Sequence, residues 1–65
     1  MHNVSIRIGV KTWSADITDD TYEFLRDGSF LRRRPIEFFL FRIVTEYGDL
    51  TEENILRFMD EKWVL

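Results

Sequence analysis

The stretch Asp27–Phe41, DGSFLRRRPIEFFLF, sets three consecutive arginines against a block of aromatic side chains, and its interpretation decides the fold. An Asp-Gly pair between two apolar-rich runs favours a two-residue hairpin turn of type I′. Pairing outward from this turn places apolar residues opposite one another and Glu23 opposite Arg32, which are sensible cross-strand neighbours. Residues 19–26 are also compatible with a short helix that is capped by an aspartate and ends at Gly28. The Asp-Gly pair makes the hairpin the preferred interpretation.

Before this stretch, the chain alternates apolar and polar residues as a strand with one buried face does. Val4, Ile6, Ile8 and Val10 share one parity. The parity changes by Trp13, so the chain turns or bulges between Gly9 and Thr12 and continues as a second extended segment. Strands and hairpins are therefore predicted over about residues 3–34.

After this stretch, the apolar spacing changes to three and four residues, which is typical of a helix. Pro35 suits a first helical turn and Gly48 suits a left-handed C-cap, so a helix is predicted over residues 35–47. Its expected apolar stripe is Ile36, Phe39, Leu40, Ile43, Val44 and Tyr47.

A second helix is predicted over residues 51–63. Thr51 is a natural N-cap, and Leu50 is placed to pack against Ile55 as a hydrophobic staple. The apolar face is expected to hold Ile55, Leu56, Met59 and Trp63. The predicted fold is a single α+β domain over residues 1–65, with a small antiparallel sheet followed by two helices.

Composition excludes several classes of function. The chain has 65 residues, a net charge of −3 and no cysteine. The negative charge argues against a dedicated nucleic-acid binder, and the aromatic content argues against disorder. No apolar run is long enough for a membrane span, and no signal peptide is recognisable, so a cytoplasmic protein without membrane contact is expected.

His2, the single histidine, has no companion ligand, and no nucleophile is coupled to a base. We expect no metal, no cofactor and no enzymatic activity.

The aromatic residues outside the helical stripes point to a binding surface. A helix that is apolar around most of its circumference is either sandwiched between other elements or completes its burial against another chain. Protein-binding anchors are therefore predicted at Phe38, Phe41, Phe58 and Trp63. Charged contacts to an acidic partner or to phosphate are predicted at Arg32, Arg33 and Arg34.

The segments PIEFFLFRIV and LTEENILRFMDEKW, placed after a strand that ends in LRRRP, resemble the winged-helix effector domain of the OmpR/PhoB type. The resemblance covers roughly residues 17–63. In that family a third helix enters the DNA major groove and a C-terminal hairpin forms the wing. This chain ends before either, so the resemblance implies a truncated winged-helix scaffold without a recognition helix or wing.

A ribbon-helix-helix repressor is the alternative resemblance. In it, VSIRI is the groove-reading strand, DDTYEFLRDG the first helix and RPIEFFLFRIVTEY the second, in an intertwined dimer. It explains Phe38 and Phe41 as dimer core, but not the extended stretch of residues 10–17.

The expected function is a small adaptor or inhibitor that binds another protein, or a second copy of itself, through exposed aromatics. The winged-helix resemblance points to the transcription machinery or another regulator. The alternative is a dimeric DNA-binding repressor, of the ribbon-helix-helix or the winged-helix kind.

Overall fold

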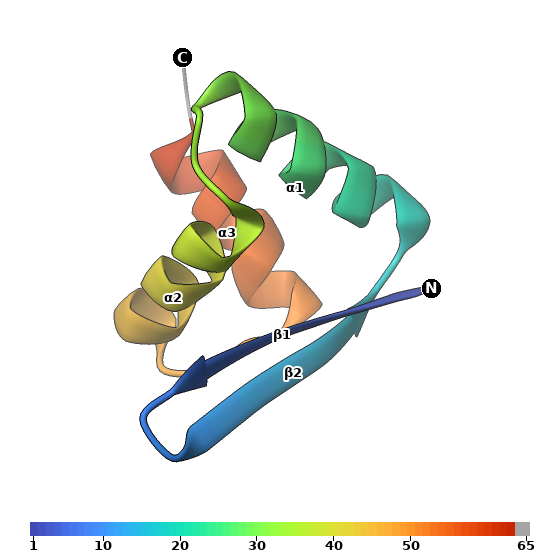
Figure 1. Cartoon of the computed structure of the whole chain (residues 1–65). Helices are drawn as coiled ribbons and strands as arrows, with labels where there is room; N and C mark the ends of the chain where they lie inside the picture. Colours follow the sequence, from blue (N-terminus) through green and yellow to red (C-terminus); the bar gives the residue numbers. More distant parts are fainter. Residues whose placement is uncertain (64–65) are drawn as a thin grey trace.

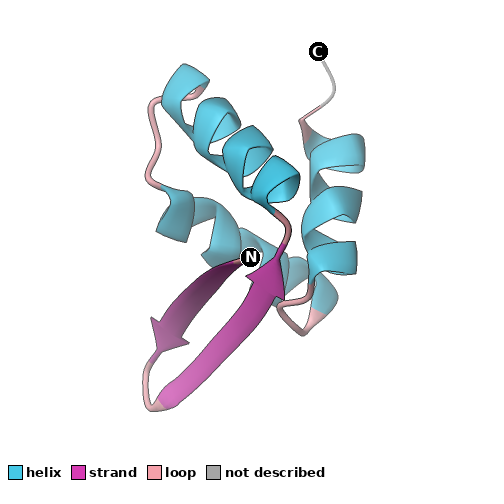
Figure 2. Cartoon of the chain, turned by 90° about the vertical axis from the view of Figure 1, so that its right-hand side faces the viewer, coloured by secondary structure: helices cyan, strands magenta, loops and turns pink. Residues whose placement is uncertain are grey.

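The computed structural model, which describes residues 1–63, has a two-stranded antiparallel sheet followed by three helices (Figure 1). The predicted α+β class is therefore confirmed. The elements in chain order are β1 (His2–Ile8), β2 (Lys11–Ile17), α1 (Asp19–Leu31), α2 (Ile36–Tyr47) and α3 (Glu52–Lys62). The hairpin packs on α2 through β1 and on α3 through β2. Helix α1 packs on α2 and lies at the end of the molecule away from the hairpin turn (Figures 1 and 2).

The structure confirms the hairpin that the alternating sequence of the first 17 residues predicts. β1 and β2 pair from His2 opposite Ile17 to Ile8 opposite Lys11, so Gly9 and Val10 form the turn. Gly9 has a φ of 64°, which a glycine at the first central position of a tight hairpin turn adopts without strain. One face of the sheet contacts the core and the other is polar and exposed.

The second predicted hairpin is wrong, because residues 19–31 form helix α1. Thr18 caps the helix: its side-chain oxygen accepts from the amide of Thr21 at 3.3 Å, and two aspartates follow in the first turn. The buried residues of α1 recur at helical spacing, at Thr21, Leu25, Gly28 and Ser29. Gly28 is thus an interior helix residue, and the expected pairing of Glu23 with Arg32 across two strands does not occur.

The end of α1 explains why the sequence pattern is misleading there. The amide of Arg34 donates to the carbonyl of Ser29 and that of Arg33 to the carbonyl of Phe30, both at 3.1 Å. These two bonds define a Schellman motif, whose left-handed position is usually occupied by glycine. Here that position is held by Arg33, with a φ of 56°. The glycine near this helix end lies five residues before the left-handed position, at Gly28 in the helix interior.

Replacing Arg33 with glycine is expected to stabilise the protein. A side chain in the left-handed region carries a steric cost that glycine does not, so Arg33→Gly should raise the free energy of unfolding by about 0.5–1 kcal/mol. Chemical denaturation measures this change. Arg33→Ala is the matched control, because it removes the charge but keeps the Cβ atom, and it should leave stability nearly unchanged. Equal effects of both substitutions would contradict the assigned conformation.

Helices α2 and α3 lie where the apolar spacing predicts them. Pro35 is the N-cap of α2 and Gly48 its C-cap, with a φ of 85°. Thr51 caps α3 by accepting from the amide of Asn54 at 3.0 Å, and the stapling residues Leu50 and Ile55 are both buried. The predicted stripe of α2 is confirmed: its four central members are buried and the two outer ones, Ile36 and Tyr47, are partly buried.

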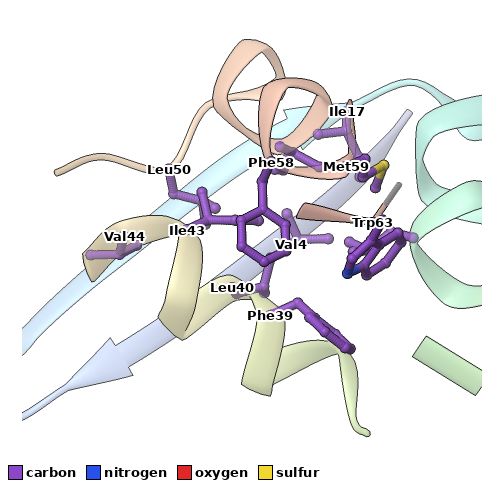
Figure 3. Packing of buried hydrophobic residues seen from close by; sticks show 12 residues of the cluster. Val4, Ile17, Phe39, Leu40, Ile43, Val44, Leu50, Phe58, Met59 and Trp63 are labelled. Carbon is purple, nitrogen blue, oxygen red and sulfur yellow. The ribbon is translucent and has the colours of Figure 1, made fainter. Parts of the chain in front are cut away.

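An aromatic cluster fills the centre of the core (Figure 3). Phe58 is fully buried, and its ring centroid lies 6.3 Å from that of Phe39 and 6.2 Å from that of Trp63. Phe39 and Trp63 meet edge to face at 4.9 Å, a favourable geometry for aromatic pairs. The expected stripe of α3 is confirmed at Ile55, Met59 and Trp63. Leu56, which was expected in this stripe, faces outward, and Phe58 faces the core.

A hydrogen-bonded link joins the first turns of α1 and α3. The carboxylate of Glu52 accepts from the backbone amide of Thr18 at 2.9 Å and from its hydroxyl at 3.0 Å. The amide of Thr18 is the largest cause of a lowered pKa at Glu52, followed by the hydroxyls of Thr21 and Thr18. These donors favour the ionised carboxylate in the folded protein.

This link predicts a loss of stability in acid. Because the pKa of Glu52 is lower in the folded state, its contribution is present above the unfolded pKa and disappears as pH falls through the folded value. Glu52→Gln should therefore lower stability at pH 7 and flatten the decline of stability as the pH falls below the unfolded carboxyl pKa of about 4.3. Urea unfolding above and below this pKa, with Glu53→Gln as control, measures the difference. Parallel pH profiles for wild type and Glu52→Gln would contradict the assignment.

Candidate protein-binding surface

Two phenylalanines stand on the outer side of α2, where a surface helix normally presents polar residues. Phe38 is 40% exposed and Phe41 is 46% exposed. They lie three positions apart, hence on one side of the helix, opposite the buried stripe. Two of the four predicted anchors therefore stand together at the surface.

Neighbouring side chains hold this surface in shape. The ring of Phe38 meets that of Phe39 edge to face at 5.2 Å, which couples the exposed ring to the core. The guanidinium of Arg34 lies 5.4 Å from the centroid of Phe38, within the range of a cation–π contact. Arg42, one helical turn after Phe38 on α2, has its guanidinium 5.2 Å from the ring of the buried Phe58. We refer to Arg34, Phe38, Phe41 and Arg42 as the α2 aromatic face.

The other two predicted anchors are not at the surface. Phe58 is fully buried and Trp63 is buried against Phe39, Phe58 and Gly28. The expectation that they are exposed is wrong, because helix α1 supplies a third wall that the predicted hairpin lacked. A packed core side chain cannot contact a partner without local unfolding, so these two residues are assigned to stability.

The three arginines do not act as one cluster. Arg32 donates to the carbonyls of Gly28 at 3.2 Å and of Trp63 at 3.1 Å, and its guanidinium lies 4.3 Å from the Trp63 ring. It therefore ties the end of α1 to the end of α3. Arg33 and Arg34 are exposed, and Arg34 belongs to the α2 aromatic face. Of the predicted charged contacts, two thus remain available to a partner.

Charges on the outside of α3 are mainly acidic. Glu53, Asp60 and Glu61 are exposed there, and Glu61 accepts from the hydroxyl of Tyr47 at 2.7 Å. This hydrogen bond lowers the pKa of Glu61 and raises that of Tyr47. Arg57 also contacts Glu61, at 3.3 Å. An acidic outer face is unsuited to lying along phosphates, which sets α3 apart from a DNA-reading helix.

No family model, curated protein or solved structure matches the chain. The winged-helix resemblance thus stays a prediction, and the helix at residues 19–31 departs from the strand that it assigns there. The ribbon-helix-helix alternative places helices close to α1 and α2, but β1 pairs with β2 of the same chain instead of with a second copy.

Two negative findings apply to residues 1–63. None of their helices is both long and apolar enough to cross a bilayer. Their His, Asp and Glu side chains form no group of three or more that could hold a metal ion.

Sequence reasoning missed a second apolar surface, between α1 and α3. Phe24 and Leu56 are 57% and 45% exposed, and with Met59 and Asp60 they line a groove of about 380 Å³. We refer to these four residues as the α1–α3 groove. A helical projection of residues 19–31 places Phe24 beside, and not within, the stripe of Thr21, Leu25 and Gly28. That signal was hidden by the hairpin interpretation of Asp27-Gly28.

Proposed function

We propose that this protein is a small binding module that contacts another protein through the α2 aromatic face. The observation that carries the proposal is the pair of exposed phenylalanines on a helix whose opposite side is fully packed. Aromatic and arginine side chains are the residues most often found at energetic centres of protein interfaces. Phe38 and Phe41 are the proposed anchors, and Arg34 and Arg42 supply positive charge beside them.

The charge beside the anchors favours an acidic partner surface. Within the described residues, neither Arg34 nor Arg42 takes part in an ion pair, and both are exposed. Complementary charge across an interface speeds association and suppresses wrong partners more than it adds affinity. An adaptor or an inhibitor of a larger protein fits a module of this size. The winged-helix resemblance is the support for a partner in the transcription machinery or for another regulator.

Direct DNA binding is the second candidate function, and the exposure of Arg33 and Arg34 is the observation that favours it. The net charge of −3 and the structural role of Arg32 oppose it. A phosphate-binding surface predicts an affinity that falls steeply as salt increases and that is lost when these arginines are removed.

A parallel capture experiment separates the two functions. The tagged protein is incubated with lysate of the source cells, with and without nuclease, and bound proteins are quantified by mass spectrometry. A protein recovered in stoichiometric amount in both arms, and retained by Arg33→Ala, supports the binding module. Recovery that disappears with nuclease and with Arg33→Ala/Arg34→Ala contradicts it and supports nucleic-acid binding.

A further inference from the structure

The α1–α3 groove has an apolar floor, Asp60 in its lining, and further acidic residues one helical turn away on α1 and α3. Met59 is buried at its base, and Phe24 and Leu56 form its two sides. One helical turn from Phe24 lie Asp20 and Asp27, and one helical turn from Leu56 lie Glu53 and Asp60. Every charged residue at these spacings is acidic.

Helices α1 and α3 lie side by side along the groove. The first turns of α1 and α3 are linked by Thr18 and Glu52, and their last turns meet where Gly28 lies against Trp63. The two helices therefore run in the same direction, as Figures 1 and 2 show. The groove lies between them and stays open to solvent.

Favourable interactions of carboxylates with helix N-termini explain only part of this acidic rim. Asp20 and Glu53 lie in first turns, where carboxylates stabilise the positive end of the helix. Asp27 and Asp60 lie far from those turns. Asp27 pairs with Arg26 at 3.5 Å, whereas Asp60 has no ion pair among the described residues. The groove therefore suits an apolar side chain that carries positive charge beside it.

The same chain presents a surface with these properties at the end of α1. Phe30 is 82% exposed and Leu31 is 76% exposed, although both are large and apolar. Arg33 follows at the left-handed position of the Schellman motif and is exposed. We refer to Phe30, Leu31 and Arg33 as the α1 corner.

We propose that the α1–α3 groove receives the α1 corner of a second copy of this chain. The pairing places the apolar pair Phe30 and Leu31 against Phe24, Leu56 and Met59, and places Arg33 among the acidic rim residues. A single contact thus covers both apolar surfaces that the fold leaves open at α1. Because the two surfaces differ, the contact is heterologous, so copies add head to tail or close into a ring.

Sedimentation velocity from about 1 µM to about 1 mM protein tests this contact in the full chain. The weight-average mass of wild type should rise above that of the monomer with concentration, and the rise should shift to about tenfold higher concentration in high salt. Leu56→Lys in the groove and Phe30→Ser/Leu31→Ser at the corner should each remain monomeric. Asp60→Lys is a second groove variant that leaves the apolar residues intact.

Mixing the variants makes the test specific. Leu56→Lys keeps an intact corner and Phe30→Ser/Leu31→Ser keeps an intact groove, so an equimolar mixture should form a one-to-one dimer. Val10→Ser, at the exposed hairpin turn, and Phe38→Ser/Phe41→Ser, on the α2 aromatic face, should associate as wild type does. Circular dichroism establishes that each variant is folded.

Two results would overturn the proposal. One is a wild-type protein that stays monomeric at about 1 mM, which would leave the groove to a basic segment of a different protein. The other is an association that persists unchanged in folded Leu56→Lys and Asp60→Lys.

Discussion

Phe58→Ala is expected to unfold most of the protein at 25 °C. The side chain is fully buried among Phe39, Trp63 and the apolar stripe of α2, so its removal leaves a cavity that the surrounding helices cannot fill. Phenylalanine-to-alanine changes in protein cores cost about 3–5 kcal/mol. In a domain of fewer than about 70–80 residues, a single hydrophobic core rarely supplies more than about 3–5 kcal/mol of stability, so this loss removes most of what is available. Loss of the cooperative thermal transition, followed by circular dichroism, is the predicted result.

Phe38→Ala is the matched control for this prediction. It removes the same atoms from a half-exposed ring on α2, and it should lower the free energy of unfolding by about 1 kcal/mol or less. Similar losses for the two variants would mean that Phe58 and Phe38 are buried alike, which contradicts the assignment of one to the core and the other to the surface.

Gly28→Ala is expected to destabilise the protein, although the same change in an exposed helix interior stabilises by about 1 kcal/mol. A Cβ atom at Gly28 would overlap three ring atoms of Trp63, the nearest of which is Cζ3. The indole is held by Arg32 above it and by Phe39 and Phe58 beside it, so it cannot move without loss of these contacts. Overpacking of this kind costs about 1–3 kcal/mol.

A double-mutant cycle identifies the cause of the Gly28 effect. In a Trp63→Phe background the ring is smaller, so Gly28→Ala should cost less than in wild type, and the helix propensity of alanine should recover part of the difference. An equal cost in both backgrounds would mean that Gly28 is required for its backbone conformation and not for its contact with Trp63.

The sequence predicts the parts of the fold that depend on local patterns. The alternation in β1 and β2, the turn at Gly9, the stripe of α2 and the caps at Gly48 and Thr51 are each visible within a few residues. These features rest on periodicity and on the conformational demands of single positions, and at these positions the tertiary contacts agree with the local signal.

A helix over residues 19–26 is the less favoured of the two interpretations of the sequence, because the decisive contacts of α1 are distant in sequence. Gly28 is tolerated inside the helix since Trp63, at the other end of the chain, occupies the space beside it. The end of the helix has arginine where glycine is usual, and Arg32 gains its partners from Trp63. An Asp-Gly pair is a strong hairpin signal only where no distant side chain overrides it.

Only part of the candidate site follows from the sequence, because the rest depends on contacts that are distant in sequence. Phe38 and Phe41 lie off a clear helical stripe, so their exposure follows from the sequence of α2 alone. The burial of Phe58 and Trp63 depends on the wall that α1 provides, and the α1–α3 groove exists only because α1 is a helix. Surfaces formed by two elements require knowledge of how those elements pack.

The central proposal is that Phe38 and Phe41, the exposed aromatic pair of α2, carry the binding function. Its most direct test is quantitative capture from lysate with three baits: wild type, Phe38→Ser/Phe41→Ser, and Val10→Ser as a control that removes an exposed apolar residue elsewhere. We predict that the double variant loses at least 90% of the captured protein partner, that the control retains it, and that all three baits keep the same circular dichroism spectrum. Undiminished capture by the folded double variant would contradict the claim.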